Sequence, residues 1–593
     1  MKTLSTWQAT WKLIRCSPWP FLLYFVLWTF YLSSWLIPGL IVQAMFDDLT
    51  GAAPVEIGFW GLISLLAAVE IARITANLSK RVGEETFRYT IQALLRKNIV
   101  TNLLRRPGAE GLPVSAGDAI SRLRGDVAEL ADFPTWLPHV LGYVVLAVVC
   151  VVIMFTIHPL ITLVAVLPSL AVAAIGYYTW GRILRYWDAS RATNGAVTGF
   201  LGEILGAVQA VKVADAEADV IAHFQTLNQA RRKAELKTHL MWELIHWISY
   251  NLGDLGFGVV LLLAGQAMRP GPEGVATFTV GDFALFSVYI GHIIHIPGTL
   301  GSFIADYRTQ AVSIKRMLEL QPHAPPETLV AQGPTYVRGA FPSLTRPAKT
   351  PAQRLQKLQV SGLTCKYPNS ENGVQDVRLC LERGSFTVVT GRIGSGKTTL
   401  LRALLGLLPK DAGEVQWNGQ LVQDPASFFV PPRSAYTGQV PVLFSESLKD
   451  NILMGLPEDE VDLPAALRAA VLEQDVGELQ AGLETIVGPK GVKLSGGQVQ
   501  RAAAARMFVR GPELLVFDDL SSALDVETER ALWERVFSSP GRPTCLVVSH
   551  RRPALRRADH IVVLQDGKVE AEGKLEELLE SSAEMQRLWR GER

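Results

Sequence analysis

The residues best suited to chemistry form the run GRIGSGKT, from Gly391 to Thr398. The run follows a strand-like segment, SFTVVT, and opens a helix-like one, which is the context that a phosphate-binding loop requires. Gly391, Gly394 and Gly396 let the backbone N–H groups turn toward an anion. Lys397 is expected to reach the β- and γ-phosphates of a nucleotide, and the Thr398 hydroxyl is expected to bind Mg²⁺. The remaining predicted nucleotide-binding positions of this loop are Arg392, Ile393, Ser395 and Thr399.

A second group of polar residues ends the apolar run LLVFDD. Asp518 follows four apolar residues, at the carboxyl end of a predicted buried strand, which is where parallel sheets bind their ligands. We therefore expect Asp518 to hold Mg²⁺, through water. In nucleotide hydrolases the next residue often handles the attacking water, and here that residue is Asp519.

A third run, LSGGQ, opens the helix-like segment VQRAAAARMF. Ser495 is expected to cap this helix, and Gly496 and Gly497 expose backbone N–H groups before Gln498. The result is an anion site of the same physical type as the phosphate loop. By itself the run is equally compatible with an ordinary helix start.

The elements that carry these runs differ in composition from the first half of the chain. Of the 593 residues, 49% are hydrophobic and only 19% are charged, whereas soluble domains carry about 25% charged residues. Six apolar segments, each near the length of about 20 residues that a membrane span needs, are predicted at 19–46, 57–78, 136–157, 159–180, 244–268 and 280–304. We expect the helices of spans two to five to continue beyond the membrane.

The loops predict the orientation of these spans. Lys and Arg residues are concentrated in the two long connections, 79–130 and 181–237, so the positive-inside rule places these connections and both termini in the cytoplasm. Residues 321–354 are rich in proline and indicate a linker. From residue 355 onward, β-branched runs alternate with helical ones, which predicts an α/β domain on a mostly parallel sheet. The predicted fold is therefore multidomain: an α-helical six-span transmembrane domain at 1–320, a linker at 321–354 and an α/β P-loop ATPase domain at 355–593.

Taken together, the ordered runs GRIGSGKT, YTGQVPVLFSESLKDNI, LSGGQVQR, LLVFDD, SSALD and VVSHR resemble those of the ATP-binding-cassette (ABC) transporter family. The resemblance covers almost the whole chain, and its closest form is a bacterial exporter-type half-transporter with one nucleotide-binding domain. It implies ATP and Mg²⁺ as ligands, a multi-pass protein of the cytoplasmic membrane, and two ATP molecules held between two cassettes, so that a dimer is obligatory.

The resemblance also implies further roles for single residues. Tyr367 matches the aromatic residue that stacks on adenine. Gln439 matches the glutamine that reaches Mg²⁺ and the attacking water, and His550 matches the histidine that contacts the γ-phosphate. The run Ser495–Gln498 would cover the ATP held by the partner subunit. With Asp519, the residues Gln439 and His550 make up the predicted catalytic set.

Asp519 departs from the family pattern, because hydrolytically active members usually carry glutamate there. A general base must come within about 2.6–3.2 Å of its proton, and a misplacement of about 1 Å can cost about 10²-fold in rate. We therefore expect slow turnover of the ATP on this chain's own phosphate loop. An aspartate here often marks one member of a heterodimer, which is the interpretation we favour. The alternatives are a homodimer with a slow base and a membrane sensor that ATP gates without transport.

The cargo is less well defined by the sequence than the ATP site. A small molecule, a lipid and a peptide all fit an exporter or flippase that works by alternating access. A net charge of +1 gives no indication of a nucleic-acid partner. The predicted partners are membrane lipids, the transported substrate and a second half-transporter subunit.

Overall fold

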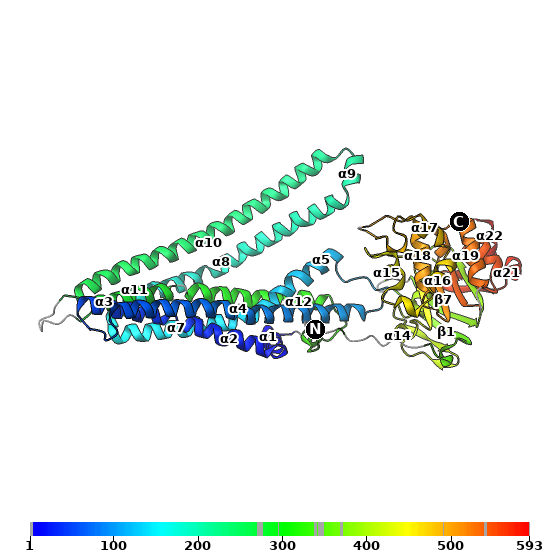
Figure 1. The fold of residues 1–593 in the computed structure, drawn as a ribbon. Coiled ribbons are helices and arrows are strands. Elements are labelled where there is room, and N and C mark those ends of the chain that lie inside the picture. Colours follow the sequence, from blue (N-terminus) through cyan, green and yellow to red (C-terminus); the bar gives the residue numbers. More distant parts are fainter. Residues whose placement is uncertain are drawn as a thin grey trace. The chain divides into compact units, whose positions relative to one another are not determined.

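The computed structural model describes residues 4–269, 277–294, 296–336, 341, 349–367, 370, 372–489, 491–538 and 542–591. The chain divides into two compact units (Figure 1). Unit 1 comprises Met1–Leu103 and Leu112–Ala340, and unit 2 comprises Leu104–Gly111 and Phe341–Arg593. The predicted domain boundaries at 320 and 355 stay predictions.

Unit 1 is helical. Its elements are α1 (Thr6–Cys16), α2 (Pro18–Ser33), α3 (Leu36–Thr50), α4 (Gly58–Leu104), α5 (Ala116–Ser121), the π-helical turn η1 (Arg122–Asp126), α6 (Val127–Asp132), η2 (Phe133–Thr135), α7 (Trp136–Ile157), α8 (Pro159–Gly206), α9 (Val208–Val213), α10 (Glu217–Ala267), α11 (Val280–Ile293), α12 (Ile296–Glu319) and η3 (Pro326–Val330). Within the described residues, six helical stretches are long and apolar enough to cross a membrane. The prediction of six spans is therefore confirmed.

Three of the helices are much longer than a membrane is thick. Helices α4, α8 and α10 contain 47, 48 and 51 residues. At 1.5 Å per residue each is roughly 70 Å long or more, over twice the apolar thickness of about 30 Å. Helices α8 and α10 lie side by side and are joined through α9 (Figure 1). These helices extend well beyond the bilayer, as predicted.

The first span is not the single helix that hydropathy suggests. It consists of α2 and α3, which are separated by a turn at Ser34 and Trp35. Pro38 has no N–H group to donate to the carbonyl of Ser34, so the helical ladder is interrupted at this point. The carbonyl of Ser34 accepts instead from the N–H group of Ile37 at 3.2 Å, and the Ser34 hydroxyl donates to the carbonyl of Tyr31 at 2.6 Å.

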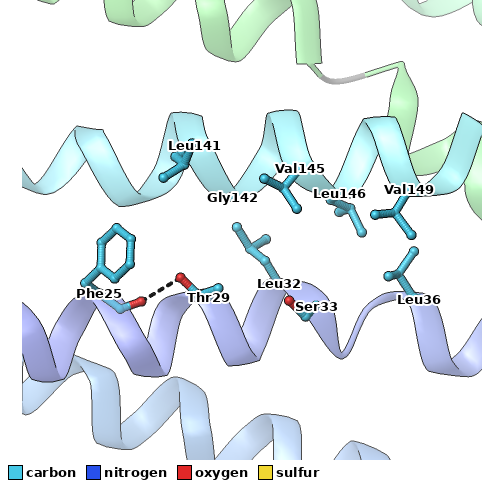
Figure 2. A pocket seen from close by; sticks show the side chains of 10 residues that line it. All are labelled: Phe25, Thr29, Leu32, Ser33, Leu36, Leu141, Gly142, Val145, Leu146 and Val149. Atoms are coloured by element: carbon cyan, nitrogen blue, oxygen red, sulfur yellow. Dashed lines mark hydrogen bonds between the residues drawn. The ribbon is translucent and has the colours of Figure 1, made fainter.

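Small residues allow the helices of unit 1 to pack closely. A Cβ added to Gly83 of α4 would lie 2.9 Å from the backbone N of Tyr24 in α2. Helices α2 and α7, together with Leu36 of α3, line a partly open apolar cavity of about 120 Å³, and Figure 2 shows its lining side chains, among them Phe25 and Leu146. The Thr29 hydroxyl in this lining donates to the carbonyl of Phe25 at 2.8 Å. The lining of the cavity is thus mainly apolar, and the hydroxyl of Thr29 is engaged by its own helix.

The described part of unit 2 contains two sheets. Within the described residues, the order of the larger sheet is β10 (Lys568–Gly573), β9 (His560–Gln565), β3 (Phe386–Gly391), β8 (Thr544–Val548), β7 (Leu514–Asp518) and β6 (Ser434–Thr437). All of its neighbours are parallel except β10 and β9. The smaller sheet is antiparallel, in the order β2 (Gly373–Glu382), β1 (Lys357–Lys366), β4 (Ala412–Trp417) and β5 (Gln420–Leu421). The α/β prediction is confirmed, and the antiparallel sheet was not foreseen.

The larger sheet is buried on both faces, because alternate side chains of each strand enter different cores. Val388, Leu515 and Phe517 belong to one apolar cluster, together with α18 (Gly496–Phe508) and α19 (Val526–Ser538). Val389 and Val516 belong to the other cluster, together with α13 (Lys397–Leu404) and the smaller sheet. Burial on both faces explains why these strands consist of continuous apolar runs. The remaining helices of unit 2 are η4 (Pro351–Gln353), α14 (Pro425–Phe428), α15 (Leu448–Leu453), η5 (Glu458–Glu460), α16 (Leu463–Ala469), α17 (Glu473–Glu478), η6 (Gly482–Glu484), η7 (Leu520–Ala523), α20 (Arg552–Arg557), α21 (Leu575–Ser581) and α22 (Ala583–Arg590).

Candidate active site

The topology of the larger sheet gathers four chain segments at one edge. Strands β3, β8, β7 and β6 are consecutive, parallel neighbours, so their carboxyl ends share that edge. Gly391 ends β3, His550 follows β8, Asp518 ends β7 and Gln439 follows β6. Four predicted site residues that are distant in sequence are therefore placed at the same edge.

The phosphate-binding loop connects β3 to α13 with a backbone that glycine permits. Gly394 and Gly396 have φ values of 83° and 98°, a region that other residues rarely adopt. A Cβ on Gly391 would lie 2.2 Å from the carbonyl O of Leu564. The Lys397 Nζ donates to the carbonyls of Gly391 and Arg392 at 2.8 and 2.6 Å. The lysine is thus already folded back over the loop that would receive phosphate.

The other predicted positions of the loop differ in exposure. Ile393 is 96% exposed, whereas Ser395 and Thr399 are buried. The Nε of Arg392 lies 2.7 Å from the carboxylate of Glu584, at the start of α22. Tyr367 is partly exposed, and its hydroxyl lies 3.4 Å from Oγ1 of Thr399. The aromatic ring predicted to meet adenine is therefore close to the loop.

Asp518 lies at the centre of a buried polar cluster. Its carboxylate accepts a hydrogen bond from the Thr398 hydroxyl at 2.9 Å and one from the Tyr436 hydroxyl at 3.2 Å. Asp518 is only 1% exposed. Burial raises the pKa of Asp518 above its ordinary value, although the hydrogen bonds from Thr398 and Tyr436 oppose this shift. Burial likewise raises the pKa of Tyr436 to about 12.

Asp519 has an unusual backbone conformation, with φ of 55°. Among residues other than glycine, aspartate is one of the few that enter this left-handed region readily. Its N–H group donates to the carbonyl of Val548 at 3.1 Å, which fixes the end of β7 against β8. Burial raises the pKa of the Asp519 carboxyl, and the electrostatic interaction with the His550 side chain opposes this shift.

The charges of the Asp518 and Asp519 carboxylates both act on Lys397. Burial lowers the pKa of Lys397, while the charges of Asp519 and Asp518 act in the opposite direction. The Thr398 hydroxyl and the Asp518 carboxylate lie beside this lysine. Hydroxyl, carboxylate and phosphate oxygens are ligands that Mg²⁺ accepts. Within the described residues, no group of three or more His, Cys, Asp or Glu side chains is arranged to hold a metal ion. A magnesium ion here could complete its coordination with water or phosphate oxygens.

The run Ser495–Gln498, called the signature run below, is separate from this cluster. Ser495 is the N-cap of α18, with its hydroxyl accepting from the N–H group of Gln498 and its own N–H group donating to the Gln498 side chain. Gly496 and Gly497 form the first turn of the helix. Within the part of the chain that the structure describes, no hydrogen bond or ion pair joins Ser495–Gln498 to the phosphate loop.

Three functional neighbours were missed by sequence reasoning. Tyr436 contacts Asp518, Glu584 contacts Arg392, and Gln500 donates from Nε2 to the backbone carbonyl of Gln439 at 2.7 Å. The side chain of Gln439 itself is exposed. Tyr436 belongs to the run YTGQ, which the sequence analysis singled out. Its contact with Asp518 could not be predicted from that run, because it depends on the pairing of β6 with β7.

Comparison with known proteins agrees with this geometry. Residues 21–296 match the model of the ABC transporter transmembrane region, and residues 374–522 match the ABC transporter model. The chain belongs to the ABC transporter family. A solved structure of a bacterial Atm1-family ABC exporter with ATP bound shares the fold of this ABC transporter, with a TM-score of 0.73 at 18% identity over 98% of each chain.

Curated relatives of this ABC transporter include proteins with different cargoes in their names. The antigen peptide transporter 2 of Mus musculus is 26% identical over 81% of this chain and 66% of its own length. A probable multidrug resistance ABC transporter ATP-binding/permease protein of Bacillus subtilis is 28% identical, over 71% and 68%. An ATP-dependent lipid A-core flippase of Alkalilimnicola ehrlichii is 33% identical, over 48% and 49%. The chain thus spans about two thirds of the length of the first two relatives.

The family assignment establishes several features. The chain is a multi-pass membrane protein with an ATP-binding cassette, and the members of its family hydrolyse ATP. Half-transporters of this kind, with one membrane region and one cassette in a chain, work as dimers.

Proposed function

We propose that this chain is one half of an ATP-driven exporter or flippase, with both termini in the cytoplasm and its spans in the cytoplasmic membrane of a bacterium. The observation that carries the proposal is the division of the ATP site. The phosphate loop, Thr398 and Asp518 are assembled in one place, while the capped start of α18 stands apart from them. A second subunit would bring its own α18 to this loop, and the ATP would be enclosed between the two.

Within each site the residues would divide the work. Lys397 and the loop N–H groups would neutralise the phosphates. Thr398, Asp518 and Gln439 would hold Mg²⁺, which supplies further charge neutralisation when it is bound. Asp519 would orient the attacking water, and His550 would contact the terminal phosphate. Tyr367 would stack on adenine. The position of the buried Asp518 carboxylate, 2.9 Å from the Thr398 hydroxyl, supports a cation site, since carboxylate and hydroxyl oxygens are ligands that Mg²⁺ accepts.

We further propose that the ATP on this chain's own loop turns over slowly. The Asp519 carboxylate ends one methylene short of the glutamate that active members carry, and the backbone N–H group of Asp519 is tied to Val548. Its partner in the membrane would be a different half-transporter that carries the efficient site. This chain would then contribute its signature, Ser495–Gln498, to that site.

The test uses the full chain purified from membranes, alone and together with a co-expressed half-transporter from a neighbouring gene. We expect weak ATPase activity for the chain alone and high activity for the pair. Ordinary transporter rates from the chain alone would reject the heterodimer and favour a homodimer. Inverted vesicles containing the pair, supplied with fluorescent lipids, peptides or cationic dyes, test transport itself. ATP-dependent movement of at least one class is expected, and its absence for every class would favour an ATP-gated sensor.

A further inference from the structure

Asp475, which lies outside the motifs described above, forms a hydrogen bond to the signature run Ser495–Gln498. Asp475 belongs to the short helix α17, and its Oδ1 accepts a hydrogen bond from Nε2 of Gln498 at 3.1 Å. The same carboxylate forms a two-pronged ion pair with Arg501, with N–O distances from 2.7 to 3.1 Å. Both side chains of this pair are largely buried, with 13% and 14% of their surface exposed.

The polar groups of Gln498 are already engaged inside its own subunit. Its Oε1 accepts from the N–H group of Ser495 at 2.8 Å, and its amide nitrogen donates to Asp475. Its backbone N–H group donates to the Ser495 hydroxyl oxygen at 3.3 Å. The Ser495 hydroxyl proton and the N–H groups of Gly496 and Gly497 are the groups that remain for an anion at this helix start. Gln498 is thus placed to support the signature rather than to touch the nucleotide.

We propose that Asp475 is a positioning residue for the ATP site of the partner subunit. By fixing Gln498 and Arg501, which lie one turn apart on α18, its carboxylate keeps the capping box of Ser495 closed before ATP arrives. The donors of the signature are then already oriented when the two cassettes meet, and no ordering of the loop is needed at that moment. A buried ion pair with two prongs defines orientation more strictly than a single contact.

The inference rests on the proposed function, because the signature acts on ATP only in a dimer. Loss of the Asp475 carboxylate is nevertheless expected to affect one of the two ATP sites and not the other. Removing the Asp475 charge should weaken the site on the partner's phosphate loop. It should leave ATP binding to this chain's own phosphate loop unchanged, since Lys397 and Thr398 make their hydrogen bonds within the described residues to Gly391, Arg392, Ser395 and Asp518 rather than to α17.

The experiment compares Asp475→Asn with Glu478→Gln, a matched control that neutralises an exposed carboxylate on the same helix. Three quantities are measured on the full chain in nanodiscs: hydrogen exchange of the Ser495 and Gln498 amides, affinity of the lone chain for a fluorescent ATP analogue, and Mg-ATPase activity of the assembled dimer. Asp475→Asn is expected to accelerate exchange at both amides by about tenfold or more. It should lower dimer ATPase by about tenfold and change own-loop affinity by less than about twofold.

The outcomes separate the possible explanations. Unchanged exchange together with ATPase within twofold of wild type would overturn the proposal. Loss of own-loop ATP affinity in Asp475→Asn would also overturn it, because the residue would then support the whole cassette. An equal effect of Glu478→Gln would also overturn the proposal, because the effect would then come from the net charge of α17 rather than from the contacts of Asp475. If the wild-type dimer neither binds nor hydrolyses ATP, the proposed function fails, while the exchange measurement still decides whether Asp475 holds the signature.

Discussion

The most informative single substitution is Asp519→Glu. Glutamate adds one methylene, which advances the carboxylate by about 1.5 Å. Since a misplacement of about 1 Å can cost about 10²-fold, restoring the reach should raise the turnover of ATP on this chain's own loop by roughly 10- to 100-fold. This change corresponds to a barrier lower by about 1.4–2.7 kcal/mol.

The backbone at this position sets an opposing cost. Residue 519 has φ of 55°, and a longer side chain in this region is expected to cost about 1 kcal/mol of stability. The melting temperature of the cassette should therefore fall by about 2–4 °C. The ground state and the transition state share this backbone conformation, so the strain should reduce stability without reducing the rate.

A matched control separates the two effects. Asp376 also has a positive φ, of 48°, and is exposed on β2. Asp376→Glu should therefore lower the melting temperature by a similar amount and leave ATPase activity unchanged. The assay is single-turnover release of phosphate from Mg-ATP by the full chain, assembled with the second subunit. If Asp519→Glu melts at a lower temperature but hydrolyses no faster, the idea that carboxylate reach limits this site is refuted.

Three further predictions follow from the same structure. In EDTA, Asp518→Asn should raise the melting temperature by about 2–4 °C, because a buried carboxylate with a raised pKa is lost. This gain should shrink as the pH falls through that pKa, where the folded wild-type protein takes up a proton. A gain that is constant with pH would argue against a buried charge. Gln500→Leu should lower ATPase activity by about tenfold with less than a twofold loss of ATP affinity, because the carbonyl of Gln439 loses its hydrogen-bond donor. Affinity is measured by titration with fluorescent ATP and activity by phosphate release. A fall of both quantities together would contradict this prediction. Gly83→Leu should lower the yield of folded protein by detergent gel filtration, because the added side chain would clash with the backbone near Tyr24, and an unchanged elution profile would show that α2 and α4 can separate.

Local chemistry explains what could be predicted from the sequence. The phosphate loop depends on glycines, a lysine and a threonine within eight consecutive residues, so its shape is encoded locally. The ends of β3, β7 and β8 were predicted because long apolar runs stop at polar residues there. The capped start of α18 was predicted because Ser495 is a strong N-cap residue. Six spans followed from hydropathy, which depends only on composition along the chain.

Contacts between distant segments explain what was missed. The break between α2 and α3 was overlooked because a hydropathy window averages over Pro38. The antiparallel sheet was overlooked because its strands are half-exposed and alternate in polarity, so they lack the continuous apolar runs of the central sheet. Leu329 and Val330, which lie within the predicted linker, are buried in unit 1, and the Asn98 amide donates to the Leu329 carbonyl; composition does not reveal such a contact.

The sequence by itself determined that the chain has membrane spans, a phosphate loop, an aspartate at the end of a buried strand and a capped helix start at Ser495, because each of these depends on neighbouring residues. Only the tertiary structure decided which partners these groups have. The hydroxyl of Tyr436 reaches Asp518, and the carboxylate of Asp475 reaches Gln498, across 82 and 23 residues of sequence. The physical reason is that a hydrogen bond requires two atoms within about 3 Å, and strand pairing and helix packing, rather than sequence spacing, bring these atoms together.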